Sequence, residues 1–207
     1  HELSALVRKS AAPCAATARG IPTRGRRVNR LIPIDGTDDI PPSVRGTGIA
    51  RLLEYHDLGR PFETHQQAEL LVGMCMDYRK HLRIPDNFAY IVRAGGANLR
   101  YSEFKVSYAI AIGGVTSIAL IGHSQCGMVD IESRRRQFID GLVERAGWQR
   151  EAAEEQCRQF APTFEIGNEV DFVRSEAKRL RLRYPKIAVA PLLFRVEDNR
   201  IYALRED

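Results

Sequence analysis

His123 and Cys126 stand three residues apart, directly after a short apolar run over residues 115–121. Two glycines, Gly113 and Gly114, precede the run, and this pattern is typical of a strand buried on both faces of a parallel sheet. In open α/β sheets, ligands and catalytic groups collect at the carboxyl ends of the strands. An imidazole and a thiolate at that place can bind one metal ion, but two protein ligands do not complete a site.

Cys75 supplies a third candidate ligand. It stands at the end of another strand signal, over residues 69–76, and two parallel strands that end side by side would bring it to His123 and Cys126. A Cys–His–Cys set offers zinc two thiolates and an imidazole and leaves a fourth position open, which is typical of catalytic sites. Each residue alone is more often a buried or loop residue without a metal. The set of three predicts a zinc site.

Asp77 and Arg79 follow Cys75 at alternate positions. On an extended segment or tight turn, the three side chains would lie on one side of the chain. An Arg79–Asp77 ion pair would keep the carboxylate ionised and oriented beside the metal, where it can accept a hydrogen bond from a reacting water. The alternative is an ordinary surface pair, which contributes about 0–1 kcal/mol. The position beside Cys75 favours the pair as part of the site.

Strand and helix signals alternate along the chain and predict an α/β fold. The expected architecture is a mostly parallel central sheet flanked by helices. Asn168 is expected to cap a helix that runs to about Tyr184 and is stopped by Pro185. The other expected elements are a short helix over residues 49–55, a helix over 101–112, charged helical sequence over 128–165, and strands over 69–76, 88–92, 115–121, 187–196 and 201–204.

Two parts of the chain are predicted, an N-terminal arm with little regular structure over residues 1–44 and a zinc-binding α/β catalytic domain over residues 45–207. The net charge is +5, and basic residues concentrate in the arm. A nucleic-acid-binding segment or a targeting remnant remains open, but the arm lacks the interleaved aromatic residues of single-strand binders. A solvated or partner-wrapping arm is favoured, so no nucleic-acid partner is expected.

The cysteine content and hydropathy bear on the compartment. Four cysteines in 207 residues do not make a disulfide scaffold, which favours a reduced, intracellular and cytoplasmic setting, with an organelle or microcompartment left open. No apolar run is long enough to suggest a membrane span.

The two motifs together, Cys75-x-Asp77-x-Arg79 and His123-x-x-Cys126-Gly127, resemble the paired signature of the β-class carbonic anhydrases. The similarity runs from about residue 66 to residue 129 and more weakly to the C-terminus. It implies an enzyme, a carbonic anhydrase, that hydrates carbon dioxide reversibly to bicarbonate and a proton by means of a zinc-bound hydroxide.

The resemblance also implies roles for individual residues. Zn²⁺ would be held by Cys75, His123 and Cys126, with Asp77 and Arg79 as a catalytic dyad and Asp77 as a possible fourth ligand in a closed state. Gln66 would contact substrate across a subunit interface, and Gly127 would bind substrate as well. The expected partners are the small-molecule substrate and at least one further copy of the chain, in a homodimer or a higher homo-oligomer.

Two departures from the family pattern leave alternatives open. Tyr78 stands where the family has serine, and Ala94 stands where it has asparagine. One alternative is a hydrolase of carbonyl sulfide or carbon disulfide at the same site. The other is a catalytically silent, zinc-binding structural or regulatory homologue. His56, His65 and His81 are candidate proton shuttles, and the sequence does not choose among them.

Overall fold

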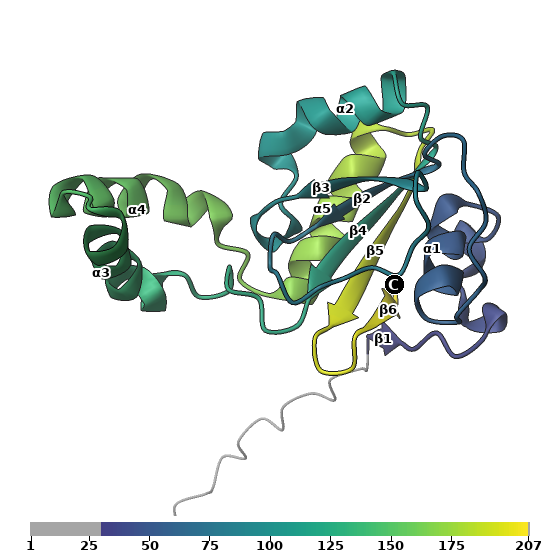
Figure 1. The fold of residues 1–207 in the computed structure, drawn as a ribbon, viewed down its shortest axis with the longest axis horizontal. Helices are drawn as coiled ribbons and strands as arrows, with labels where there is room; N and C mark the ends of the chain where they lie inside the picture. The colour runs from purple at the N-terminus through teal and green to yellow at the C-terminus, as the bar shows by residue number, and fades with distance from the viewer. Residues whose placement is uncertain (1–29, 207) are drawn as a thin grey trace, which may run out of the picture.

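The computed structural model describes residues 30–206, which form a six-stranded sheet with helices on both faces and a helical projection (Figure 1). The strands lie in the order β1-β6-β5-β4-β2-β3. Their bounds are β1 Leu31–Ile32, β2 Leu70–Met74, β3 Ala89–Arg93, β4 Ser117–His123, β5 Ala188–Arg195 and β6 Arg200–Leu204. The helices are α1 Gly48–His56, α2 Glu103–Ala111, α3 Arg135–Ala146, α4 Arg150–Phe164 and α5 Glu169–Arg183.

The central strands β5, β4, β2 and β3 run parallel. On the other side of β5, β6 is the one reversed strand, because it pairs antiparallel with β5 and with β1. Every residue of β2 and β4 is buried, as their continuous apolar runs require of strands covered on both faces. All five predicted strands are present, with their ends shifted by at most two residues. The predicted α/β fold with a mostly parallel sheet is confirmed.

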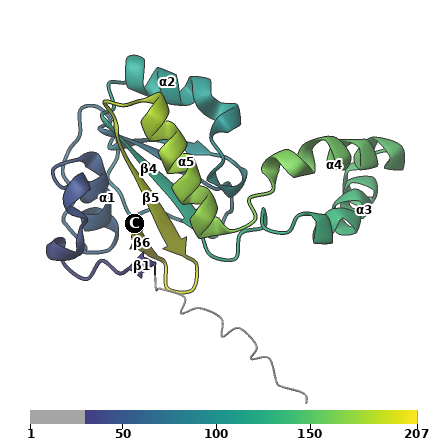
Figure 2. The ribbon, with the colours of Figure 1, turned by 180° about the vertical axis from the view of Figure 1, so that it is seen from behind.

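The two faces of the sheet carry different helices. One face packs against α1 through a cluster that includes Ile49, Leu52 and Phe194. The other face packs against α2 and α5 through a second cluster that includes Val106 and Val173 (Figures 1 and 2). This arrangement gives the sheet two covered faces and leaves β3 as an edge strand.

Helix α5 begins and ends where the sequence predicts. The Asn168 side chain accepts a hydrogen bond from the backbone N–H of Asp171, 3.0 Å away, which is the expected N-cap. Helix α5 ends at Arg183, two residues before Pro185. The first turn of α5 lies beside the segment that follows His123, because the Glu169 carboxylate accepts a hydrogen bond from the backbone N–H of Cys126.

Helices α3 and α4 form a hairpin that projects away from the sheet (Figures 1 and 2). Gly147, with a φ of +71°, ends α3 in the left-handed conformation that glycine adopts without strain. A separate small cluster of Ile139, Ala153 and Cys157 holds the two helices together. The predicted helical character of this region is therefore present, but the hairpin has its own core.

The segment before α1 lies against the folded body from residue 30 onward. It has the two-residue strand β1 and two short 3-10 turns, and its apolar residues Ile34, Ile40 and Val44 are buried beside α1. The predicted arm over residues 1–44 falls outside the described residues as far as residue 29, and its boundary at residue 44 stays a prediction. Among residues 30–206, no helix is long and apolar enough to cross a membrane.

Candidate metal centre

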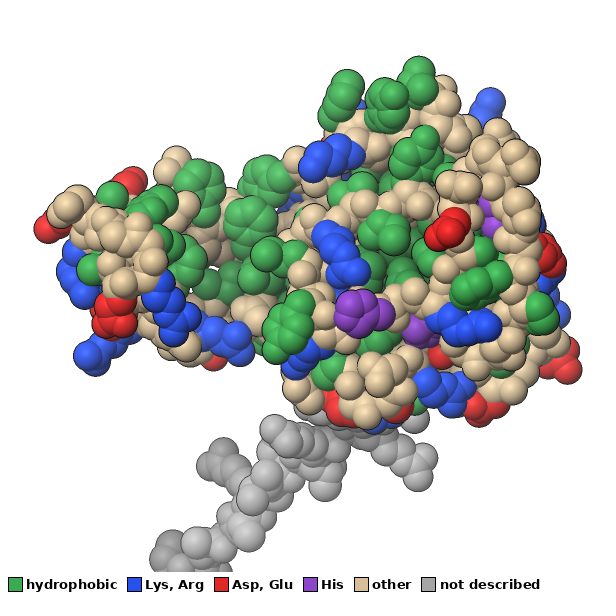
Figure 3. Space-filling view, in the orientation of Figure 1, with side chains coloured by type: hydrophobic (Ala, Val, Ile, Leu, Met, Phe, Trp, Pro, Cys, Tyr) green, Lys and Arg blue, Asp and Glu red, His purple; other side chains and the backbone are tan. Residues whose placement is uncertain are grey.

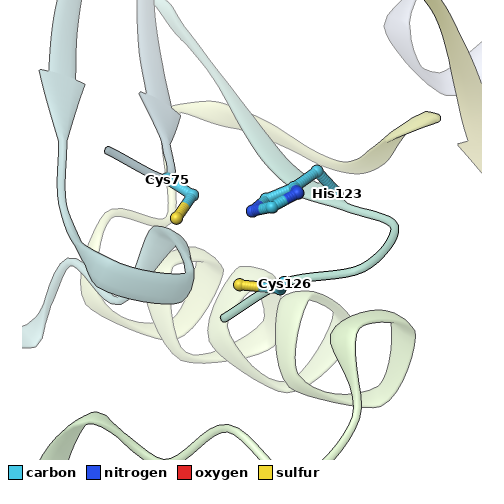
Figure 4. A group of neighbouring side chains, drawn as sticks. All are labelled: Cys75, His123 and Cys126. Atoms are coloured by element: carbon cyan, nitrogen blue, oxygen red, sulfur yellow. The ribbon is translucent and has the colours of Figure 1, made fainter. Parts of the chain in front are cut away.

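Two neighbouring strands deliver the three predicted ligands to one place. Met74 at the end of β2 pairs with Ile121 of β4, so Cys75 and His123 lie together at the carboxyl ends of these two neighbouring strands. Cys126 follows in the turn after β4. One sulfur or nitrogen atom from each of these residues lies within 4.8 Å of the other two, and the side chains point toward one another (Figure 4). The structure therefore brings together the group that the sequence predicts.

His123 is presented as a metal ligand would be. Its Nδ1 lies 2.8 Å from the carbonyl oxygen of Ser124, so a proton on Nδ1 can be donated to that oxygen. The other ring nitrogen, Nε2, is buried and has no hydrogen-bond partner among the described residues. Burial of a polar atom without a hydrogen-bond partner costs free energy. The lone pair of Nε2, which faces the two cysteine sulfurs, would gain such a partner from a bound cation.

The two cysteines are buried, each with about 3% of its surface exposed. The pKa of Cys75 is lowered, chiefly because the Cys126 thiol donates a hydrogen bond to its sulfur. The pKa of Cys126 is raised, because the same hydrogen bond holds its proton and because the thiol is buried. The backbone N–H of Gly96 also points at the Cys75 sulfur, 3.3 Å away. The Glu169 carboxylate accepts from the backbone N–H of Cys126 at 3.2 Å and ties this turn to α5.

Asp77 and Arg79 form the predicted pair beside this group. Arg79 donates from Nε to Asp77 Oδ1 at 3.0 Å and from Nη2 to Asp77 Oδ2 at 2.8 Å. The backbone N–H of Arg79 adds a third bond to Oδ1 at 2.9 Å. The Arg79 side chain lowers the pKa of Asp77 well below its usual range, against the opposing effect of burial. The carboxylate is therefore ionised throughout the physiological range.

The structure also places three other residues that the sequence singled out, Gly127, Gln66 and Tyr78, relative to the three ligands. Gly127 follows Cys126, and a side chain at position 127 would meet the Arg134 guanidinium at 3.2 Å. Gln66 precedes the amino end of β2, whereas Cys75 follows its carboxyl end, so Gln66 does not reach the site of its own chain. Tyr78 is 85% exposed, so its ring is not packed against the buried ligand group.

The sequence reasoning missed four residues that support the site. Lys80 is fully buried, and its Nζ donates to the carbonyl oxygen of Asp77 at 3.4 Å. Arg93, at the end of β3, donates to backbone carbonyls of the same segment. Gln125 and Glu197 form a polar link from Arg79 to the β5–β6 turn. Only Gln125 carries a sequence signal, because it stands between two predicted ligands.

Comparison by sequence finds no relatives: no family model matches the chain, and no curated protein matches it. Comparison of structures finds proteins with a similar fold. A carbonic anhydrase from Glaciozyma antarctica matches with a TM-score of 0.55 and 17% identity over 76% of this chain and 93% of that chain. The β-carbonic anhydrase isoform I of Trichomonas vaginalis matches with a TM-score of 0.56 and 15% identity over 72% and 90%.

A carbon disulfide hydrolase in its apo form also matches, with a TM-score of 0.50 and 19% identity over 77% of this chain and 89% of that chain. At these identities the comparisons establish the fold. The described chain has the fold of the β-carbonic anhydrases, as the paired motifs predicted.

Proposed function

We propose that this protein is a zinc-dependent carbonic anhydrase that hydrates carbon dioxide reversibly to bicarbonate and a proton. The observation that carries the proposal is the buried Cys75–His123–Cys126 group with the Asp77–Arg79 pair next to it, on a β-carbonic-anhydrase fold. The motifs predict both parts separately, and the closeness of the two parts in the fold supports treating them as one site.

The donor set fits zinc. Two thiolates and an imidazole are ligands that Zn²⁺ prefers, and three protein ligands leave one position open. The Nε2 of His123, which has no hydrogen-bond partner within residues 30–206, and the inward-pointing sulfurs support this assignment. When bound, zinc acts as a Lewis acid and lowers the pKa of a coordinated water to about 7.

The chain's own residues would then orient the reactants. Asp77, kept ionised by Arg79, accepts a hydrogen bond from the attacking water and directs its lone pair at the carbon of CO2. On one side of the site, Cys75 and Cys126 form a buried apolar cluster with Ile166, and Met128 packs against this cluster, partly buried. Such a lining suits a small neutral substrate. Arg79 anchors Asp77 so that the carboxylate does not itself occupy the open position.

A second candidate function is hydrolysis of carbon disulfide or carbonyl sulfide. The structural match to a carbon disulfide hydrolase favours this candidate. The same nucleophile can attack the carbon of CO2 or the carbon of its sulfur analogues. A third, a zinc-binding protein without activity, would require the open position to be blocked. The exposure of Tyr78 argues against this residue as the block.

The test is a stopped-flow CO2 hydration assay of zinc-loaded protein at mildly alkaline pH. Wild type should be active, and Asp77→Asn should lose roughly 100-fold or more in kcat/KM with its zinc retained. Asp86→Asn, which changes an exposed carboxylate elsewhere, should match wild type. Zinc-loaded wild type that hydrolyses only the sulfur compounds would select the second candidate. Inactivity toward all three substrates would select the silent protein.

We also propose that the protein forms a homodimer through the side of the sheet at β3 and α2. Hydrophobic side chains gather over α2 at the top of Figure 3. Phe104 and Ile112 are 82% and 71% exposed, and a groove of about 300 Å³ between α2 and β3 is lined by Tyr90, Ile91 and Tyr108, among others. An exposed apolar face beside an edge strand is typical of an interface.

Light scattering at micromolar concentration tests this assembly. Wild type should be at least a dimer, and Phe104→Asp should shift it toward monomer, while Phe104→Leu should keep the wild-type mass. A wild-type monomer would refute the proposal.

Gln66 is tested separately. If the partner subunit brings Gln66 to the site, Gln66→Ala should raise the KM for CO2, while Gln67→Ala at the neighbouring position should leave it unchanged. An intracellular location stays a prediction from the cysteine content.

A further inference from the structure

Gln125 has a left-handed backbone conformation in the turn between His123 and Cys126. Its φ is +57°, a region that residues other than glycine seldom adopt. Such strain persists only where surrounding contacts hold it, and it often marks functional sites. The contacts of Gln125 therefore bear on what this turn does.

Arg79 contacts Gln125 twice. Its Nη2 donates to the Gln125 carbonyl oxygen at 3.0 Å, and its Nη1 donates to Oε1 at 3.3 Å. The same guanidinium holds both carboxylate oxygens of Asp77 through Nε and Nη2. One arginine thus joins Asp77 to the turn that carries Cys126.

Glu197 holds Gln125 from the opposite side. The Gln125 Nε2 donates to Glu197 Oε1 at 2.9 Å, and the Ser124 hydroxyl donates to Oε2 at 2.7 Å. The Ser124 hydroxyl oxygen also accepts from the backbone N–H of Val196 at 3.0 Å. The bond from Ser124, with a smaller contribution from Gln125, lowers the pKa of Glu197, so its carboxylate is ionised. The β5–β6 turn is therefore fastened to the turn after β4.

The amide of Gln125 suits this place chemically. It faces a cation on one side and an anion on the other, and a neutral amide can accept from the first and donate to the second. A carboxylate here would repel Glu197, and an ammonium would repel Arg79. The chain from Asp77 through Arg79 and Gln125 to Glu197 is continuous.

We propose that Gln125 is a positioning residue that, with Glu197, holds Arg79 on Asp77 and so keeps Asp77 away from the open metal position. This inference rests on the proposed function. The Arg79 side chain is about one-third exposed and would otherwise have freedom to leave Asp77. With Gln125 in place, two further bonds restrict it. Loss of the amide increases the population in which Asp77 occupies the open position and the site is closed.

Anion binding measures the open population directly. The probe is azide, titrated into Co²⁺-substituted protein at fixed, mildly alkaline pH and followed by visible absorption. Because an anion binds only the open site, its apparent Kd equals the intrinsic Kd divided by the open fraction. Gln125→Gly should raise this Kd roughly tenfold, the usual effect of losing a hydrogen bond to a charged group, and lower kcat/KM for CO2 hydration equally.

Gln125→Gly separates positioning from simple stability. Glycine adopts a positive φ without strain, so the thermal midpoint should be unchanged or higher while azide affinity falls. Gln125→Asn also tolerates the left-handed conformation, but its amide is too short to span Arg79 and Glu197, so it should show part of the loss. Gln137→Ala, an exposed glutamine on α3, is the matched control and should behave as wild type.

The outcomes distinguish this inference from the proposed function. Wild-type affinity for azide in both Gln125→Gly and Gln125→Asn would overturn the positioning role and leave the enzyme assignment intact. A parallel loss of azide affinity and thermal stability in Gln125→Gly would also overturn it, because that pattern indicates a structural role alone. Metal-loaded wild type that binds no azide and hydrates no CO2 would overturn the proposed function and this inference with it.

Discussion

The Arg93 guanidinium lies 3.2 Å from the carbonyl oxygen of Cys75 and 3.2 Å from that of Lys80. One side chain from the end of β3 therefore bridges both ends of the segment that carries the first cysteine and Asp77. The segment between has no regular structure, and its carbonyls need donors where they are shielded from water. Arg93 supplies these donors in the fixed fork geometry of a guanidinium.

Replacement of Arg93 should weaken metal binding without removing a ligand. Arg93→Lys keeps the charge but loses the fork, so we expect zinc affinity to fall about tenfold, as for other residues that orient metal ligands. Competition with a chromophoric chelator measures this affinity. Arg136→Lys, on the exposed face of α3, is the control. Equal zinc affinity in Arg93→Lys and wild type would contradict the orienting role.

Removal of a ligand should have a larger effect than removal of a buried cysteine elsewhere. Cys75→Ala and Cys126→Ala should each lose zinc, and the free energy of unfolding should fall because metal binding and folding are coupled. Cys157→Ala removes a buried thiol from the α3–α4 hairpin. It should cost about 1 kcal/mol in stability and retain about one zinc per chain. Metal analysis with chemical unfolding distinguishes the two cases, and full zinc occupancy in Cys75→Ala would exclude the site.

Loss of Arg79 should release Asp77. In Arg79→Ala the main cause of the lowered pKa of Asp77 is gone, and the carboxylate is free to move. We expect zinc to be retained and CO2 hydration at mildly alkaline pH to fall by at least tenfold, the usual scale for a misoriented catalytic group. Arg145→Ala near the end of α3 serves as a control. Wild-type activity in Arg79→Ala would remove the pair from the mechanism.

The sequence predicted those features that follow from local patterns along the chain. Buried strands have continuous apolar runs, and parallel strands end at one edge, so Cys75 and His123 could be placed together before the fold was known. The Asn168 cap was predictable for the same reason, because its partner lies three residues away.

Side-chain contacts between distant segments that no motif marks were not predictable. Gln125 meets Glu197 only because β4 and β5 are adjacent, and Arg93 meets Cys75 only because β3 pairs with β2. The projection of the α3–α4 hairpin was also missed, since its apolar positions pack on each other rather than on the sheet. Helical periodicity reports that a face is buried but does not identify its partner.

Asp57 is a buried carboxylate outside the metal site and makes stability depend on pH. It caps α1 at its C-terminus, its side chain is 1% exposed, and Oδ2 has no hydrogen-bond partner among the described residues. Burial raises its pKa from 3.8 to about 6. The backbone N–H of Ile201, at 3.1 Å, and Arg200, at 3.7 Å, oppose this effect, while Asp198 adds to it.

The sign of the effect follows from proton binding. Between about pH 4 and pH 6 the folded state holds a proton on Asp57 that the unfolded state has lost, so stability decreases as pH rises through this range. Above it, the buried charge destabilises the folded state by up to about 3 kcal/mol. Asp57→Asn removes the charge and should be more stable than wild type at neutral pH, with the difference vanishing near pH 4.

Urea unfolding of wild type and Asp57→Asn across this pH range measures the difference between the two proteins. Because zinc release in acid affects both proteins alike, it cancels from that difference. Asp38→Asn, which changes an exposed carboxylate in a 3-10 turn, is the matched control. A stability difference for Asp57→Asn that stays constant from acid to neutral pH would show that Asp57 is not the titrating group. A growing difference that Asp38→Asn lacks would assign the pH dependence to the single carboxylate between α1 and β6.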